Sequence, residues 1–383
     1  MFRQDSTAEA AFRKEVRGWL EANLPVALRG RTARPPPAEL MPWYHKLSER
    51  GWIAPHWPKE YGGMGASLNE QIILSEELAR VAAPQLPVQG INHIGPILMK
   101  FGTDAQKAKH LPPILRGDVI WAQGYSEPGA GSDLASLTTR AVFDGDKFVV
   151  TGQKVWQTWG HHSHWMFTLV RTDPSAERKQ AGISFLLIEL DSPGIRRRPI
   201  VTIAGDDELS ETFFDDVVVP KENLVGGLHG GWAIANDLLS HERLAIANPQ
   251  FAFEAIARIE AVGRANGAME DPVLLDRLAK LRIKAVTQAA LFSHAASLTA
   301  SGRHLGAEAS ILKLVATDNL QAIADLLIEV AGAHGADQQR HPTADGDVDV
   351  TPLFLQCRRA TIYGGSSEIL RNIVSKRVLN LPG

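Results

Sequence analysis

The sequence predicts a chain of mixed α and β class, with helical regions at both ends and a β region between them. Apolar residues follow helical spacing in the first third, change to short β-branched and aromatic runs in the middle, and return to helical spacing in the last part. We therefore expect an N-terminal α domain (1–118), a middle β-barrel or sandwich domain (119–228) and a C-terminal four-helix bundle (229–383).

The individual elements follow from the same patterns. Helical spacing recurs at Phe12, Val16 and Leu20 and again at Ile72 and Leu78. The expected strands are 139–143, 148–151, 153–159, 165–171, 183–190 and 211–219, with a hairpin turn at residues 144–145 between the first two. The expected C-terminal helices are about 231–268, 271–302, 307–333 and 352–379.

Composition narrows the class of protein. With 383 residues, 44% of them hydrophobic and 22% charged, the chain has the composition of a globular enzyme. The net charge of −3 lacks the basic footprint of a nucleic-acid binder. Cys357 is the only cysteine, which excludes an internal disulfide and fits a reducing compartment, so we expect the cytoplasm. We see neither a signal peptide nor a membrane span.

The most informative stretch is the loop of residues 126–133, SEPGAGSD, which follows an apolar run. Its glycines allow backbone N–H groups to approach an anion or a ring edge, and its serines add hydroxyls. Trp156 and Thr158 follow in a strand-like run and offer a flat apolar face beside a hydroxyl. Together these residues are typical of a site for a planar heterocycle, although each one taken alone is explained by turn chemistry or core packing.

Two other stretches resemble known binding motifs but lack the residues or spacing that those motifs require. The glycines of residues 226–231 do not form a dinucleotide fingerprint, so a nicotinamide cofactor is not expected. Asp345, Asp347 and Asp349 imitate a calcium loop, but Val350 stands where that loop needs a glycine, and we interpret the run as an acidic loop.

Three histidines, His161, His162 and His164, form a cluster beside Trp165. No Asp, Glu or Cys lies at ligand spacing nearby, so we expect no metal. The sequence favours a loop beside the cofactor or a subunit interface.

Near the C-terminus, residues 360–372 read ATIYGGSSEILRN, a helix break followed by a capping-type Ser-Ser-Glu. This segment, the loop at Ser126 and the Trp156 and Thr158 pair occur in the order and spacing of the acyl-CoA dehydrogenase family, which the chain resembles over nearly its whole length. The resemblance is nearest to large subunits of the bacterial pimeloyl-CoA and steroid-side-chain type.

The resemblance implies an FAD enzyme that converts an acyl-CoA to a trans-2-enoyl-CoA in lipid metabolism, as in fatty acid β-oxidation. The implied FAD contacts are Tyr125, Ser126, Gly131, Ser132, Trp156, Thr158, Ser366 and Glu368. Glu368 has the further interpretation of capping the final helix. The implied acyl-CoA contacts are Ser132, Arg243, Tyr363 and Gly364, the last through a backbone N–H in the oxyanion hole.

One departure concerns the catalytic base. Many family members carry a glutamate directly after the tyrosine of the last segment, where this chain has Gly364. The candidate is Glu242, which helical spacing places between Leu238 and Ile246 on an apolar stripe. Burial there raises the pKa of a carboxyl group and suits a base. The isovaleryl-type and long-chain branches are similar in carrying the glutamate at this helix position, followed by arginine.

Other departures concern assembly. The stretch 263–272 lacks the Phe-Gly pair that typical members direct to the FAD of a neighbouring subunit. The resemblance therefore implies either a homo-oligomer, a dimer or tetramer, or a heteromer with a second chain of the same family, and an electron-transferring flavoprotein as acceptor. Two alternatives stay open: a non-catalytic subunit of a heteromer, and a flavin oxidase or monooxygenase of the same fold.

Overall fold

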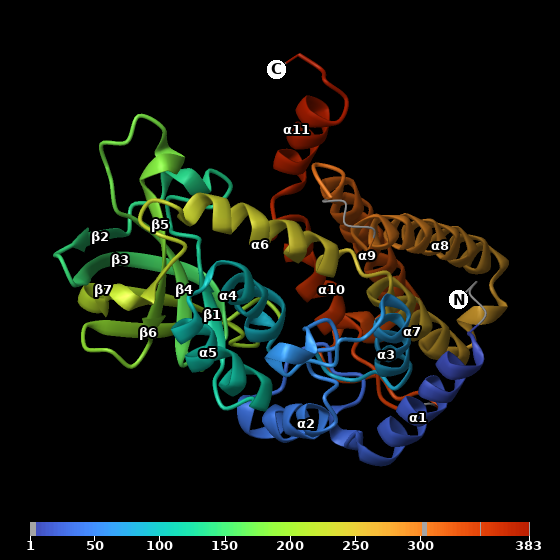
Figure 1. Ribbon diagram of the computed structural model, residues 1–383. Helices are drawn as coiled ribbons and strands as arrows, with labels where there is room; N and C mark the ends of the chain where they lie inside the picture. The colour runs from blue at the N-terminus through green and yellow to red at the C-terminus, as the bar shows by residue number, and fades with distance from the viewer. Residues whose placement is uncertain (1–4, 301–304, 345, 383) are drawn as a thin grey trace. The chain divides into compact units, whose positions relative to one another are not determined.

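The computed structural model describes residues 5–300, 305–344 and 346–382 (Figure 1). Within the chain there are two compact units. The first consists of Met1–Trp43, Gly65–Gln85 and Arg243–Gly383, and the second of Tyr44–Met64 and Leu86–Glu242. Along the chain, helices precede and follow a run of strands, which confirms the predicted mixed class. In the described part of the chain, no helix is both long enough and apolar enough to cross a membrane.

The first unit is helical. Its elements are α1 (Thr7–Asn23), the start of α2 (Pro37–Glu49), α3 (Leu68–Arg80), α7 (Gln250–Asn266), α8 (Pro272–Ala300), α9 (Ala309–Ala331), α10 (Thr351–Cys357) and α11 (Ser367–Arg377). A capping box begins α1: the Ser6 hydroxyl accepts from the Glu9 N–H, and the Glu9 carboxylate accepts from the Ser6 N–H. Ser67 and Glu70 form the same arrangement at α3. Both caps satisfy backbone donors that a helix start leaves unpaired.

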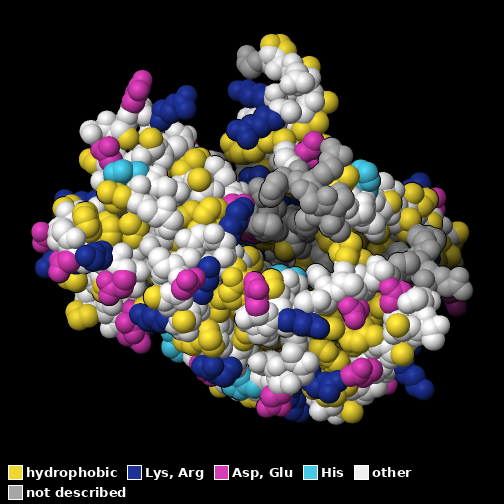
Figure 2. Space-filling model, viewed as in Figure 1, with side chains coloured by type: hydrophobic (Ala, Val, Ile, Leu, Met, Phe, Trp, Pro, Cys, Tyr) yellow, Lys and Arg dark blue, Asp and Glu magenta, His cyan; other side chains and the backbone are white. Residues whose placement is uncertain are grey.

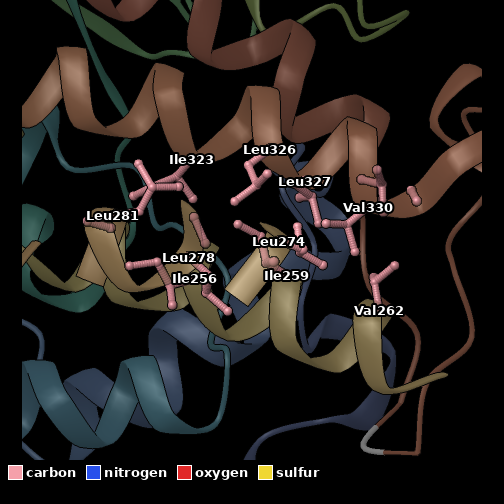
Figure 3. Packing of buried hydrophobic residues seen from close by; sticks show 14 of the residues in the cluster. Ile256, Ile259, Val262, Leu274, Leu278, Leu281, Ile323, Leu326, Leu327 and Val330 are labelled. Atoms are coloured by element: carbon pink, nitrogen blue, oxygen red, sulfur yellow. The ribbon is translucent and has the colours of Figure 1, made fainter. Parts of the chain in front are cut away.

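Helices α7, α8 and α9 pack through the apolar side chains drawn in Figure 3. Ile259 and Val262 of α7, Leu278 of α8, and Ile323 and Leu327 of α9 have no exposed surface. Burying each such side chain contributes about 1.5–3 kcal/mol. This cluster is therefore a main source of stability in the first unit.

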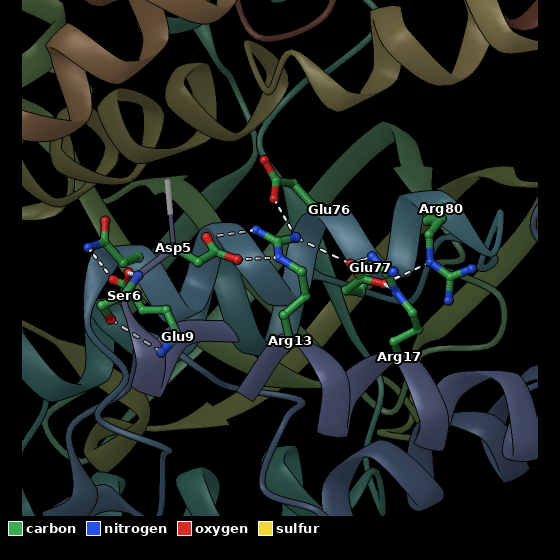
Figure 4. Close-up of polar contacts among 9 residues, drawn as sticks. Asp5, Ser6, Glu9, Arg13, Arg17, Glu76, Glu77 and Arg80 are labelled. Carbon is green, nitrogen blue, oxygen red and sulfur yellow. Dashed lines mark hydrogen bonds and ion pairs between the residues drawn. The ribbon is translucent and has the colours of Figure 1, made fainter. Parts of the chain in front are cut away.

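A buried carboxylate joins α1 to α3 (Figure 4). Glu77 is 1% exposed and accepts hydrogen bonds from Arg17 at 2.8 and 2.9 Å, from Arg80 at 2.7 Å and from Arg13 at 3.2 Å. Burial raises the pKa of Glu77, but these three guanidinium groups outweigh it and lower the pKa to about 2.

The pH dependence of stability follows from that shift. A carboxyl group whose pKa is 4.5 when unfolded and about 2 when folded stabilises the native state above pH 4.5, and this contribution is lost as the pH falls toward 2. We expect Glu77→Gln to lower the free energy of unfolding near pH 7 by about 2 kcal/mol. Chemical denaturation at several pH values should show the difference from wild type shrinking below pH 4.5. The exposed control Glu270→Gln should show no such trend, and a difference that stays constant with pH would contradict the account.

The second unit is built on one eight-stranded sheet (Figure 1). The strands are β1 (Trp121–Gly124), β2 (Arg140–Phe143), β3 (Lys147–Thr158), β4 (Trp165–Arg171), β5 (Ile183–Glu189), β6 (Ile195–Ile200), β7 (Leu209–Pro220) and β8 (Leu224–Val225). Their order is β6-β7-β3-β2-β4-β5-β8, and β1 pairs in parallel with β4. The predicted hairpin turn between β2 and β3 is present: Gly145 takes a φ of 69°, and the Asp144 N–H donates to the Lys147 carbonyl.

Helices complete this unit. They are the end of α2, a π-helical turn (Gln89–Ile94), α4 (Gly95–Phe101), α5 (Asp104–Arg116) and most of α6 (Gly231–Ile246). Gln106 near the start of α5 donates through Nε2 to the carbonyl oxygens of Glu222 and Leu224, at 2.7 and 2.9 Å. Lys100 of α4 forms an ion pair with Asp237 of α6. These contacts attach the helices to one another and to the sheet.

Several predicted boundaries are wrong. The expected helix 231–268 is two helices, α6 and α7, because Pro249 lacks an N–H and restricts the residue before it. The expected helix 352–379 is divided by Gly364 and Gly365, whose φ angles are 66° and 98°. The predicted strands 148–151 and 153–159 form the single strand β3, and β1, β6 and β8 were not predicted. The predicted helix end at residue 302 and the residue Asp345 lie outside the described residues.

Charged side chains of both signs are interspersed on the face that Figure 2 shows. Lys and Arg residues lie among Asp and Glu residues and apolar groups, without a broad area of one sign on this face. This mixture is what the net charge of −3 leads us to expect.

Candidate active site

A buried ion pair fixes the start of the loop that the sequence singles out. Glu127 and Lys154 of β3 are 5% and 0% exposed, and the Lys154 Nζ donates to the Glu127 carboxylate at 2.8 Å. The same carboxylate accepts from the backbone N–H groups of Thr138 and Thr139, at 2.7 and 2.9 Å. Lys154 also donates to the Tyr125 carbonyl at 3.0 Å. The loop is thus attached to β3 by fully satisfied charges.

The pKa values of this pair reflect both burial and mutual attraction. Burial raises the pKa of Glu127, but the Lys154 charge and the donated hydrogen bonds outweigh it and hold the pKa at about 2. Burial also lowers the pKa of Lys154 to about 8, against the opposing effect of Glu127. Both groups are therefore charged at neutral pH, and neither is available as a base.

The rest of the loop is open. Ser126 is half-buried and its carbonyl accepts from the Val155 N–H at 2.9 Å, whereas Gly131 and Ser132 are exposed. Neither Gly129 nor Gly131 has a positive φ, so glycine is not needed here for a left-handed turn. A Cβ at either position would meet no protein atom within 4 Å. Both glycines therefore leave the backbone of the loop open to solvent.

Trp156 is presented by a β-bulge. Val155 pairs with Glu211 and Gln157 with Ser210, which leaves Trp156 as the extra residue of β3. It takes a φ of 69°, costly for a bulky residue, and its side chain is 58% exposed. Strained backbone of this kind concentrates at functional sites.

A pocket of about 530 Å³ lies beside the Trp156 side chain. Its lining residues are Pro128, Val155, Trp156, Arg198, Pro199, Ile200 and Glu211. Thr158, two residues after Trp156, is half-buried where β3 pairs with Leu209. The volume is in the range of small-molecule sites, and an exposed indole at its wall suits a planar ring.

Removing the indole tests this assignment. We expect Trp156→Ala to weaken retention of a planar cofactor about tenfold while leaving the unfolding temperature nearly unchanged, because the side chain is mostly exposed. Phe143→Ala, an exposed aromatic on β2 outside the pocket, is the control and should retain cofactor normally. Equal retention by both variants, measured as bound flavin after gel filtration, would remove Trp156 from the site.

A second group of buried polar atoms includes a carboxylate oxygen of Glu242 on α6. Glu242 is half-buried, and its Oε2 is buried with no hydrogen-bond partner among the residues that the structure describes. The Tyr125 hydroxyl and the His93 Nδ1 are buried and unpartnered in the same sense. Leu238, one turn before Glu242, is 1% exposed, but Ile246, one turn after it, is only half-buried, so the predicted apolar stripe is fully buried on one side of Glu242 alone.

Electrostatics connect these groups. Burial raises the pKa of Tyr125 well above its usual value, and the Glu242 charge adds to the effect. Burial lowers the pKa of His93, and the Glu242 charge opposes that shift. Tyr125 and His93 therefore both feel the field of Glu242. Unpaired buried polar atoms cost about 1–3 kcal/mol each, so this group is a place where a polar ligand is expected.

In the first unit, the turn before α11 carries the other predicted contacts. Gly364 and Gly365 are both left-handed, and Tyr363 is 43% exposed. The Arg243 Nε donates to the Gly364 carbonyl at 3.4 Å, and the buried Lys313 donates to the Gly365 carbonyl at 2.9 Å. Two cations thus hold the turn by its carbonyl oxygens.

Ser366 and Glu368 lie at the start of α11. Ser366 is the N-cap, and its hydroxyl accepts from the Ile369 N–H. Glu368 is exposed, and hydrogen bonds from its own backbone N–H and from Ser366 lower its pKa. A carboxylate in the first turn of a helix stabilises it. The capping interpretation therefore accounts for both residues, and their contact with a cofactor stays a prediction.

Comparison with known protein families decides the identity. Residues 6–118 match the acyl-CoA dehydrogenase N-terminal domain, residues 122–217 the middle domain and residues 229–379 the C-terminal domain. The chain belongs to the acyl-CoA dehydrogenase family. Members of this family use FAD, and the chain is an acyl-CoA dehydrogenase by descent.

Relatives of this acyl-CoA dehydrogenase are known in sequence and structure. The acyl-CoA dehydrogenase IpdE1 of Mycobacterium tuberculosis is 37% identical over 97% of each chain. FadE34 of the same organism is 38% identical over 88% of this chain, which spans only 45% of that longer protein. The solved Tcur3481-Tcur3483 steroid ACAD is 33% identical with a TM-score of 0.87, and the ChsE4-ChsE5 complex of M. tuberculosis is 32% identical with a TM-score of 0.85. Both structural matches cover 100% of each chain.

The pocket beside Trp156 is lined by an exposed indole, two prolines and Ile200, together with Arg198 and Glu211, and that the FAD ring lies here stays a prediction. Sequence reasoning missed Lys154, Glu127 and His93. A lysine inside the predicted strand 153–159 and a histidine between Asn92 and Ile94 in an otherwise apolar stretch were the available signals.

Proposed function

We propose that this chain catalyses FAD-dependent α,β-dehydrogenation of an acyl-CoA thioester, with Glu242 as the base. The observation that carries the proposal is the buried, unpartnered Oε2 of Glu242 beside the equally unpartnered Tyr125 hydroxyl and His93 Nδ1. A carboxylate oxygen that accepts no hydrogen bond from the protein is available to accept the weakly acidic α-proton of a thioester. Gly364, which stands where many members carry their glutamate, has no side chain to compete for this role.

The chain's own groups have distinct tasks in the reaction. Trp156 and Thr158 would hold the ring of FAD at the pocket. The loop that carries Ser126, Gly131 and Ser132 would lie along the edge of the ring. Bound FAD supplies a hydride acceptor for the substrate's β carbon. Glu242 takes the α-proton, and the Gly364 N–H would bind the thioester oxygen as charge develops on it. Arg243 keeps the Gly364 turn in place through its carbonyl.

Tyr125 and His93 would remain neutral beside the proposed base, Glu242. A Tyr125 whose pKa is raised remains a neutral donor, and a His93 whose pKa is lowered remains a neutral imidazole. Neither forms a competing buried charge beside Glu242. Both can donate to a substrate oxygen or to Glu242 when the substrate is bound.

For the substrate, we propose a bulky acyl chain of the steroid-side-chain class, within the branched, dicarboxylic or ring-bearing types that the glycine pair at 364–365 leaves room for. Support comes from the 33% identity over the full length to a protein described as a steroid ACAD. Turnover restricted to short straight-chain acyl-CoAs would exclude this class.

For assembly, we propose a heteromer with a second chain of the same family. Support comes from the missing Phe-Gly pair in 263–272 and from the likeness to the ChsE4-ChsE5 complex. The proposed electron acceptor is an electron-transferring flavoprotein.

One experiment separates the candidate functions. A panel of acyl-CoAs is added anaerobically to the purified protein, alone and with a candidate partner chain, while flavin absorbance and assembly mass are measured. Loss of the oxidised flavin band, with slow recovery on admitting oxygen, is the expected result. Rapid reoxidation would favour an oxidase or monooxygenase. A protein that is colourless or inert alone and reacts only after the partner chain is added would favour a non-catalytic subunit.

A further inference from the structure

The loop that follows β3 brings two histidines against an aspartate from a distant part of the chain. His161, His162 and Asp207 each offer one ligand atom, and these atoms all lie within 4.8 Å of one another. No acidic residue lies at ligand spacing from these histidines in the sequence. The fold supplies the missing carboxylate from the loop between β6 and β7. The third histidine is separate, because the His164 Nδ1 accepts from the Ile120 N–H at 3.0 Å.

The His161 ring lacks the hydrogen bonds that a buried imidazole ordinarily makes. Both of its ring nitrogens are buried, and neither has a hydrogen-bond partner within the described ranges. The Nε2 lies 3.5 Å from the Asp207 carboxylate, which counts as an ion pair only if the ring is protonated. Neutral imidazole is the form that binds a metal.

We propose that His161, His162 and Asp207 bind a divalent late transition-metal ion of the Zn²⁺ class. Two imidazole nitrogens and one carboxylate oxygen form an established ligand set for such ions, whereas Mg²⁺ and Ca²⁺ prefer oxygen alone. Ligand atoms around Zn²⁺ lie about 3.4 Å apart, given bond lengths of about 2.0–2.1 Å. The needed closure is small for Asp207, whose side chain is 61% exposed.

The neighbouring cation does not occupy the site. Arg197 donates to the carbonyl oxygens of His161 and Ser163, at 3.4 and 2.7 Å, and pairs with Asp191 at 2.8 Å. Its guanidinium therefore has acceptors other than Asp207. These bonds also hold the backbone of the histidine loop in position, so that little ordering is left for metal binding to achieve.

The location explains what the ion would do. The β3–β7 pairing ends at Thr158 and Leu209, and the Trp159 N–H donates to the Glu208 carbonyl at 2.7 Å. His161 and Asp207 stand next along the same two segments. A bound ion would extend the pairing by one more cross-connection, and it would restrain the end of β3 that carries Trp156 and Thr158.

Isothermal titration of the full-length, FAD-loaded protein with ZnCl₂ tests the proposal. We expect one Zn²⁺ per chain, a rise in unfolding temperature on binding, and no binding of Mg²⁺ at the same concentration. His162→Ala and Asp207→Asn should each weaken Zn²⁺ binding at least tenfold. His294→Ala, which removes an exposed histidine from α8, should bind Zn²⁺ as wild type does.

The exposure of Asp207 makes Asp207→Asn a conservative change, so its loss of binding cannot come from misfolding if its unfolding temperature without metal is that of wild type. Equal Zn²⁺ affinity in wild type, His162→Ala and Asp207→Asn would overturn the proposal. A wild-type titration without a one-to-one step would overturn it as well.

Discussion

Glu242→Gln should leave FAD bound and lower the rate of flavin reduction by acyl-CoA by about 10²–10⁴-fold. Glutamine preserves the volume and polarity of the side chain but cannot accept a proton. Glu242 does not line the pocket beside Trp156 that we propose for the FAD ring, so retention of FAD should be unaffected. Anaerobic stopped-flow measurement of flavin absorbance gives the rate directly.

Two further variants separate the base from its surroundings. Glu242→Asp keeps a carboxylate on a shorter side chain and should recover part of the rate. The aspartate can still accept the proton, but its carboxylate lies farther from the substrate's α carbon. Glu222→Gln, an exposed glutamate of the same unit, should reduce its flavin at the wild-type rate. Undiminished reduction in Glu242→Gln would sink the assignment of the base.

Lys154→Met should lower the free energy of unfolding by about 3–5 kcal/mol, because it leaves the Glu127 carboxylate buried without its cation. Glu127 would retain hydrogen bonds from Thr138 and Thr139 but lose the attraction that holds its pKa near 2. Thermal and chemical denaturation measure the loss, which should diminish below about pH 4.5, where the carboxyl group of the unfolded chain is protonated.

The double variant Glu127→Gln/Lys154→Met provides the control. Removing both charges avoids an uncompensated buried ion, so the double variant should be more stable than Lys154→Met alone. If the two variants were equally unstable, the loss would come from the packing of the lysine stem rather than from charge. Because Lys154 also holds the Tyr125 carbonyl, FAD retention should fall along with stability.

Local patterns were sufficient for the fold class, β4 and the β2–β3 hairpin. Residues 165–170 are buried and all but Thr168 are apolar, and Asp144-Gly145 provides the turn that a hairpin needs. Such features depend on a few neighbouring residues, and therefore a sequence read without its tertiary partners can identify them. The site motifs at Ser126 and Trp156 were identified because their order and spacing resemble those of the family. Their residue types alone would not have been sufficient.

Strand β6, the Lys154–Glu127 ion pair and the position of Asp207 beside His161 were not predicted, because each depends on residues distant in the sequence. Strand β6 contains Arg196, Arg197 and Arg198, and its pairing with β7 depends on partners that no local pattern reveals. The charge of Lys154 is tolerated in the core only because Glu127 approaches it from another segment. Likewise, the neighbours of His161 in the sequence did not disclose Asp207. Tertiary contacts decide each of these cases.

The most direct test of the account is the fate of deuterium placed on the α carbon of a steroid-side-chain acyl-CoA. We predict that the wild-type protein releases deuterium from the α carbon to solvent as it forms the enoyl-CoA. With FAD bound, Glu242→Gln should release this deuterium far more slowly than the wild type. Mass spectrometry of the recovered acyl-CoA measures both species. Release at the wild-type rate by Glu242→Gln would contradict the claim that Glu242 removes the α-proton.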